Sequence, residues 1–191
     1  MEDGFRINRS DVTGLILCGG KSTRFGSPKS HFLLDGSTLV DRAVRLLSPH
    51  VRDVLLSIGD RIADDWPKLE LIPDLTPGIG PMAGLQAGMA RLQTDWMLAL
   101  AVDLPMVEHA DLDRLFEAAA KDDKAVVARD AQGRLHPLCG LYHASTRDHI
   151  ENAIARNDFA MIRLLSSLKN VRYVTLPPAN LRNINRPDDL F

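Results

Sequence analysis

The residues best suited to chemistry gather in one stretch near the N-terminus. Two adjacent glycines follow a short apolar run, and no acidic residue separates them from the cations that come next: Gly19, Gly20, Lys21, Arg24 and Lys29. Glycine lets backbone N–H groups approach phosphate oxygens, because no Cβ intervenes. Arginine can grip a phosphate bidentately, while lysine acts as a point charge. The stretch predicts a loop that binds nucleotide phosphates; the alternative is a tight turn with solvated cations.

Two familiar phosphate-binding motifs do not describe this stretch. The dinucleotide pattern G-x-G-x-x-G is absent, since the glycines fall at Gly19, Gly20 and Gly26. The P-loop pattern G-x-x-x-x-G-K-[ST] shares the final Gly-Lys-Ser, but it needs a glycine where the chain has Leu15. Because the end of the P-loop pattern does match, a P-loop kinase or GTPase remains an alternative function. Such a protein would release orthophosphate or transfer the γ-phosphate, and would not release pyrophosphate.

Two aspartates follow predicted strands. Asp103 ends an apolar run, where a carboxylate is costly unless it binds something. Mg²⁺ takes one or two carboxylates, with phosphates and water completing its shell. We therefore expect Asp103 to hold Mg²⁺, the alternative being a cap on the loop before Pro105. Asp74 fits a nucleoside contact and a turn-forming aspartate equally well.

Three polar residues in the second half of the chain are further candidates. His136 lies in a predicted apolar strand. It is either a buried, hydrogen-bonded histidine or a residue that contacts a substrate. Asn183 and Asn185 flank Ile184, so in an extended chain they point the same way. They either bind a second substrate or shape the C-terminal loop.

Length and composition narrow the class of protein. The chain has 191 residues and a net charge of -2, so it has no overall basic field for nucleic acid. We expect a loose lead-in over residues 1–11 and a single domain over 12–191. Cys18 and Cys139 lie far apart in apolar segments, which favours reduced thiols in a cytoplasmic protein. No apolar run approaches the roughly 20 residues of a membrane span, and the N-terminus has no signal-peptide core.

Strand and helix patterns alternate along most of the chain. The expected strands are 12–18, 54–58, 69–72, 96–102, 125–129, 135–142 and 171–176. The expected helices are 39–47, 82–92, 110–121, 145–156, 159–168 and 187–190. This order predicts an α/β fold, a single Rossmann-like three-layer domain with a mostly parallel, partly mixed sheet.

Parallel strands would bring the candidate residues together. The glycine stretch follows the first expected strand, Asp74 the third and Asp103 the fourth. Ligands of such sheets bind beyond the carboxyl ends of the strands. We therefore expect all three to lie at one edge of the sheet.

The motifs also resemble those of a known family. The stretch L-C-G-G-K-S-T-R-F-G-S-P-K, residues 17–29, resembles the L-A-G-G-x-S-x-R-M-G-x-D-K signature of the molybdenum cofactor guanylyltransferase family. The similarity continues in order through G-I-G-P-M-A-G-L, V-D-L-P, H-P-L and N-I-N-R-P-D-D-L, and so covers nearly the whole chain.

The resemblance implies an Mg²⁺-dependent nucleotidyltransferase that joins GMP from GTP to the phosphate of molybdopterin and releases pyrophosphate. By position it implies nucleotide contacts at Leu17, Cys18, Gly19, Gly20, Lys29 and Asp74. It places Mg²⁺ on Asp103, and the pterin near His136, Asn183 and Asn185. Arg24, Lys29 and Asp103 are the expected catalytic residues. The implied partners are the two small-molecule substrates, with transient contact to cofactor-synthesis proteins or acceptor molybdoenzymes.

Three departures from the family pattern keep alternatives open. Cys18 stands for the usual Ala, Pro28 for an Asp, and Ser57 for an Asn that is often near the base. The change at Ser57 weakens the case for guanine, so a molybdopterin cytidylyltransferase that uses CTP is the nearest alternative. A non-catalytic nucleotide-binding protein is the alternative from another class.

Overall fold

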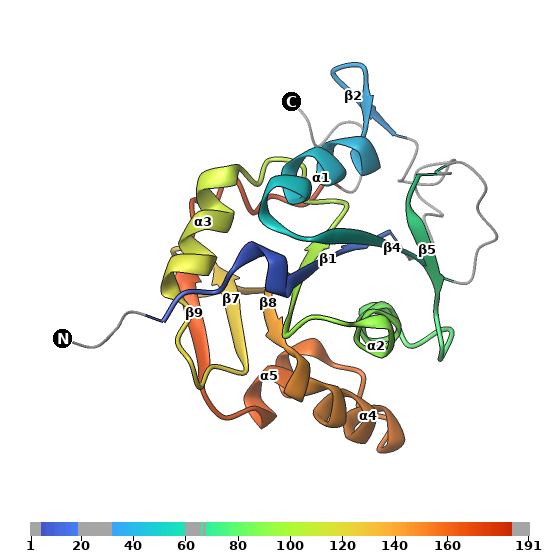
Figure 1. Cartoon of the computed structure of the whole chain (residues 1–191), viewed down its shortest axis with the longest axis vertical. Helices are drawn as coiled ribbons and strands as arrows, with labels where there is room; N and C mark the ends of the chain where they lie inside the picture. The colour runs from blue at the N-terminus through green and yellow to red at the C-terminus, as the bar shows by residue number, and fades with distance from the viewer. Residues whose placement is uncertain (1–4, 19–31, 60–65, 67, 185–191) are drawn as a thin grey trace.

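A seven-stranded sheet organises the chain (Figure 1). The computed structural model describes residues 5–18, 32–59, 66 and 68–184. The strand order is β5-β4-β1-β6-β8-β7-β9. The strands are β1 (Val12–Leu17), β4 (Asp53–Gly59), β5 (Glu70–Pro73), β6 (Trp96–Ala101), β7 (Ala125–Arg129), β8 (Leu135–His143) and β9 (Val171–Thr175).

The sheet is mixed because of one strand. All neighbouring pairs are parallel except those of β8, which runs antiparallel to both β6 and β7. Strands β1 and β6 are buried at every position, as parallel strands beneath two helix layers are. The predicted α/β class, with a mostly parallel and partly mixed sheet, is confirmed.

Helices cover both faces of the sheet, and each layer encloses its own apolar core (Figure 1). On one face lie α1 (Leu39–Leu47) and α3 (His109–Ala118). On the other lie α2 (Pro81–Arg91), α4 (Arg147–Ala155) and α5 (Met161–Ser167). Short 3-10 turns are η1 (Arg9–Asp11), η3 (Ser48–His50) and η4 (Ala144–Thr146), and β2 (Leu33–Leu34) pairs antiparallel with β3 (Ser37–Thr38).

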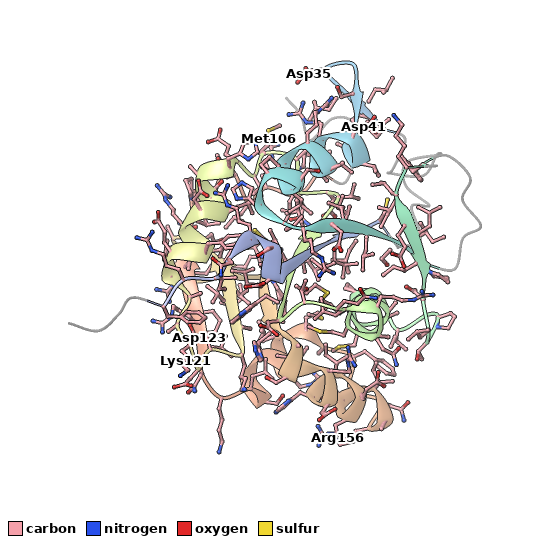
Figure 2. The ribbon with its side chains drawn as sticks, in the orientation of Figure 1. Asp35, Asp41, Met106, Lys121, Asp123 and Arg156 are labelled. Atoms are coloured by element: carbon pink, nitrogen blue, oxygen red, sulfur yellow. The ribbon has the colours of Figure 1, made fainter. Side chains whose placement is uncertain are left out.

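Local sequence signals explain where the helices begin. Thr38 caps α1, because its side chain accepts a hydrogen bond from the Asp41 backbone N–H at 3.0 Å. The Thr38 hydroxyl also donates to the Asp41 carboxylate at 2.7 Å. Asp41 lies in the first turn of α1, and Asp35 lies in the turn of the β2–β3 hairpin (Figure 2). Pro81 opens α2, where its missing N–H leaves no helical hydrogen bond unmade.

Helix ends differ from the expected ones by a few residues. Helix α3 stops at Ala118, and α4 starts only at Arg147, because the preceding residues form the 3-10 turn η4. The side chain of His143 caps that turn by accepting from the Ser145 N–H. The expected helix over 187–190 lies outside the described residues.

Two other expectations concern the environment of the chain. Within the described part of the chain, no helix is long and apolar enough to cross a membrane. Cys18 and Cys139 are both buried thiols, as expected. Burial raises the pKa of Cys139 to about 12, with a smaller contribution from Asp111 in the same direction.

Candidate active site at the carboxyl edge of the sheet

Backbone hydrogen bonds join the carboxyl ends of the parallel strands. The N–H of Cys18 donates to the Ser57 carbonyl at 3.0 Å, and that of Val102 donates to the Leu17 carbonyl at 3.0 Å. Further along the edge, the N–H of Asp74 donates to the Gly59 carbonyl at 2.9 Å. The end of β1, Asp74 and the turn that holds Asp103 therefore share one edge, as the strand order predicted.

The glycine-rich stretch begins at this edge. Leu17 ends β1, and Cys18 follows it, both with buried side chains, so what they offer a ligand is backbone. Gly19, Gly20, Lys21, Arg24 and Lys29 lie outside the described residues, as does Asn185. Their roles remain predictions.

Asp103 lies in the turn after β6 and meets the C-terminal segment there. Its carbonyl accepts a hydrogen bond from the Ile184 N–H at 2.9 Å. Its carboxylate oxygen Oδ2 accepts from Asn183 Nδ2 at 3.4 Å, the long end of hydrogen-bonding range. From the sequence alone, Asp103 is assigned to the metal and Asn183 to the second substrate. The structure brings them into contact, so both ligands would meet at this point.

His136 lies toward the same end of the sheet. Strand β8 is antiparallel to β6 with Leu100 opposite Cys139, so the residues that precede Cys139 run toward the carboxyl end of β6. The His136 side chain is only 10% exposed, and its Nε2 is 3.9 Å from Asp130 Oδ2. Burial lowers its pKa and nearby Arg134 adds to that, while Asp130 opposes both. The ring is therefore mainly neutral near pH 7, and among the described residues its Nε2 has no hydrogen-bond partner.

The loop after Asp74 is held by a side chain that sequence reasoning missed. Thr76 Oγ1 donates to Gln86 Oε1 at 2.9 Å, and Gln86 Nε2 donates to both carboxylate oxygens of Glu151 at 3.0 and 3.2 Å. Gln86 is buried in α2. The only sequence signal was one long amide among the small and apolar residues of that helix. Both ends of the amide are satisfied, so Gln86 ties the loop to α4.

Ser57, which stands where the family pattern often has an Asn near the base, lies close to the carboxyl end of β4. Its side chain is 1% exposed and sits beneath α2. Its Oγ lies 2.7 Å from the position that a Cβ on Gly84 would take. The part of Ser57 that reaches the edge is its carbonyl, which accepts from Cys18. A residue change at this position therefore acts on packing under α2.

Asp103 is the candidate metal ligand that the described residues bring to this edge. Among the described residues there is no group of three or more His, Cys, Asp or Glu side chains that could hold a metal. The carboxylate of Asp103, in contact with the amide of Asn183, fits Mg²⁺, which uses one or two carboxylates together with phosphates and water.

Two comparisons with known proteins concern the sequence. A model of the MobA-like NTP transferase domain matches residues 14–171. A probable molybdenum cofactor guanylyltransferase of Bacillus cereus (strain B4264) is 32% identical, covering 87% of this chain and 84% of that protein.

Solved structures show the same fold. Molybdopterin-guanine dinucleotide biosynthesis protein A from Archaeoglobus fulgidus superposes with a TM-score of 0.75 at 25% identity, over 93% of this chain and 94% of that one. A 2-C-methyl-D-erythritol 4-phosphate cytidylyltransferase from Thermus thermophilus gives 0.70 at 17% identity, over 97% and 96%. The second likeness concerns the fold alone.

Proposed function

The chain belongs to the family of MobA-like NTP transferase domains, and from this we propose that it transfers GMP from GTP to the phosphate of molybdenum-bound molybdopterin, with release of pyrophosphate. The observation that carries the proposal is the shared edge: the end of β1, Asp74 and Asp103 lie along it, and Asn183 contacts Asp103. Relatives named molybdenum cofactor guanylyltransferase supply the substrate pair.

The proposed reaction is an in-line displacement at the α-phosphate of GTP. The molybdopterin phosphate attacks, a new P–O bond forms, and the bond to the pyrophosphate group breaks. The attacking phosphate is already ionised, so no general base is needed. Catalysis would therefore come from positioning of the substrates and from neutralisation of phosphate charge, to which the side chains of Arg24 and Lys29 would contribute. Asp103 would hold Mg²⁺, which when bound neutralises phosphate charge.

Each half of the edge has a proposed ligand. The nucleotide would lie against the backbone from Leu17 through Gly20 and against Asp74, where glycines and a turn allow close approach. The pterin would lie toward His136, Asn183 and Asn185. A neutral His136 can give or accept one hydrogen bond there without adding charge.

The first test removes the carboxylate proposed to hold the metal. Asp103→Ala should lower Mg²⁺-dependent pyrophosphate release by about a hundredfold or more, since one such electrostatic contact contributes that much in other enzymes. The matched control is Asp53→Asn, an exposed aspartate at the start of β4 and hence at the opposite edge. Near-native turnover by Asp103→Ala would rule out Asp103 as the metal ligand.

The second test concerns the base. Thermal stabilisation by GTP, CTP, ATP and UTP should be compared with Mg²⁺ present, since a ligand at a hundred times its Kd adds roughly 2.7 kcal/mol. GTP should stabilise most. A preference for CTP would identify a cytidylyltransferase instead.

Products separate the remaining alternatives. Orthophosphate in place of pyrophosphate would indicate a kinase or GTPase, and GTP binding without turnover a nucleotide-binding protein. We also propose a cytoplasmic location, in keeping with the buried thiols Cys18 and Cys139, and transient contact with cofactor-synthesis proteins or acceptor molybdoenzymes.

A further inference from the structure

The segment that follows β9 returns to the candidate active site. We call residues 176–184 the C-terminal strap. Its apolar residues Leu176, Leu181 and Ile184 are buried in the same core as α1 and α3. Two turns fold it, with hydrogen bonds from Asn180 N–H to the Pro177 carbonyl and from Arg182 N–H to the Ala179 carbonyl. The strap is therefore anchored in the core at these three apolar residues, and its described part reaches Asp103.

One side-chain hydrogen bond attaches the strap to α3. Asn180 Nδ2 donates to Asp111 Oδ2 at 2.7 Å, across 69 positions of sequence. Asp111 is 2% exposed and lies in the first turn of α3, where its charge is favoured by the helix dipole. The same oxygen accepts from the Glu108 N–H at 3.0 Å. This bond to an ionised, buried acceptor belongs to the strong class.

The strap is thus joined to α3 at one point and to the turn after β6 at another. At one point Asn180 bonds to Asp111 on α3. At the other, Ile184 N–H bonds to the Asp103 carbonyl and Asn183 bonds to the Asp103 carboxylate. Because Asn183 follows Asn180 by only three residues on the strap, displacing the strap at Asn180 would also move Asn183. The Asn183 contact is already 3.4 Å, so a small displacement would break it.

We propose that Asn180 is a positioning residue for the transfer reaction: its hydrogen bond to Asp111 holds the strap so that Asn183 orients the Asp103 carboxylate for the metal. The inference rests on the proposed function, in which Asp103 holds Mg²⁺. Asn180 itself touches no substrate. Its effect passes through the strap.

The decisive variant is Asn180→Ala, with Arg182→Ala as the matched control. Arg182 is an exposed residue on the same strap. In Asn180→Ala the Mg²⁺ concentration for half-maximal pyrophosphate release should rise at least about threefold and kcat should fall, since a supporting hydrogen bond behind a metal ligand commonly sets affinity by tenfold or more. GTP binding without Mg²⁺ should stay unchanged. Arg182→Ala should match the wild type in all three measurements.

Two further variants at the same position separate the donor from the size of the side chain. Asn180→Asp keeps the size but removes the amide donor and places a second carboxylate against Asp111, so it should raise the Mg²⁺ requirement more than Asn180→Ala does. Asn180→Gln keeps an amide that can donate to the Asp111 carboxylate, so its Mg²⁺ requirement should lie closer to that of the wild type. A wild-type Mg²⁺ requirement in Asn180→Asp contradicts the proposal.

Amide exchange at Ile184 tests the strap without any activity. In the unliganded protein, Asn180→Ala should speed exchange of the Ile184 N–H several-fold, since that group bonds to the Asp103 carbonyl. If the wild type released no pyrophosphate, the proposed function would fail while this measurement still tested the strap. Faster exchange with an unchanged Mg²⁺ requirement would show that Asn180 stabilises the strap without affecting the metal site. Unchanged exchange would show that the Asn180–Asp111 hydrogen bond does not hold the strap. Either result overturns the inference and leaves the proposed function standing.

Discussion

The two faces of the sheet are held to their helices by different means. Under α2, the contact is made by close approach of small residues: a Cβ on Gly84 or Gly88 would come within 3.0 Å of neighbouring side chains. On the face of α1 and α3, buried polar contacts join distant segments, as in Asn180 to Asp111. The first face is thus specified by shape and the second partly by hydrogen bonds and charge.

The face of α1 and α3 also carries a polar cluster around the buried ring of His50. His50 Nε2 lies 3.0 Å from His109 Nδ1, and His50 Nδ1 lies 3.5 Å from Asp113 Oδ1. The His50 ring stacks on those of His109 and Phe116. Arg9 bonds to Asp113 at 3.2 Å from the other side. Substitutions that change side-chain volume should therefore alter the stability of the α2 face, and changes in protonation should alter the stability of the α1–α3 face.

The largest effect should come from filling the contact under α2. In Gly84→Ala the new Cβ would meet Ser57 Oγ at 2.7 Å and Leu17 Cδ2 at 2.9 Å. Overpacking of this kind costs about 1–3 kcal/mol, and the better helix propensity of alanine returns up to about 1 kcal/mol. We expect a net loss of roughly 1–2 kcal/mol in urea unfolding.

Gly88→Ala is the matched control on the same helix. There the Cβ would meet Leu15 Cδ2 at 2.7 Å and Met97 Sδ at 2.9 Å, atoms near the ends of side chains that are long but fully buried. The short Ser57 side chain is absent from this contact, so stability should fall by less than in Gly84→Ala, with the gain in helix propensity offsetting part of the adjustment. Equal losses at Gly84 and Gly88 would show that Ser57 is not the limiting contact.

A smaller effect is expected where the α2 face does use a polar contact. Gln86→Leu removes the amide that joins Thr76 to Glu151. The loss should be about 1 kcal/mol, a typical net value for such bonds. Because Thr76 lies two positions after Asp74, the KM for GTP should also rise while kcat stays close to the wild type. Urea titration measures the loss of stability, and steady-state kinetics measure KM and kcat.

Glu151→Gln is the control for that prediction. Its amide oxygen can still accept from Gln86 Nε2, so the link is kept without the charge. The KM for GTP should then match the wild type. A raised KM in Glu151→Gln would point to charge, and not to the position of the loop, as the cause.

Sequence reasoning predicted the features that depend on local periodicity. The alternation of strands and helices is such a feature, and the signals that start the helices, Thr38 before α1 and Pro81 at the start of α2, involve only neighbouring residues. The shared edge of Asp74 and Asp103 followed from strand direction alone. These features need no knowledge of which distant side chains meet.

The remaining features join residues far apart in the chain. Asn180 and Asp111 are separated by 69 positions, and His50 and His109 by 59. A single buried polar side chain has no period and no spacing rule, so nothing in the sequence pairs it with a partner. For the same reason the contact of Asn183 with Asp103 was not predicted, while its contact with the second substrate stays a prediction. Ser57 was judged by family position, which does not say that its side chain lies beneath α2.

The smallest effect should be a dependence of stability on pH that belongs to the α1–α3 face. Burial lowers the pKa of His50, Asp113 opposes this, and Arg9 and His109 add to the lowering. The unfolded chain, with an ordinary histidine pKa of about 6.5, therefore takes up a proton before the folded protein does. The free energy of unfolding should fall as the pH drops below about 6.5, until the lower folded pKa is passed.

Urea titrations at pH 7.5 and 5.5, about a unit on either side of that ordinary pKa, can assign this fall to one ring. His136 and His143 also have lowered pKa values, so the wild-type slope combines several groups. His50→Gln keeps a group able to bond with His109 but does not titrate, and its loss between the two pH values should be smaller than that of the wild type. His149→Gln changes an exposed histidine on α4, on the opposite face, and is the control for replacing a histidine by glutamine. Equal slopes in wild type and His50→Gln would mean that protonation acts through other groups, and the contrast between the two faces would then rest on packing alone.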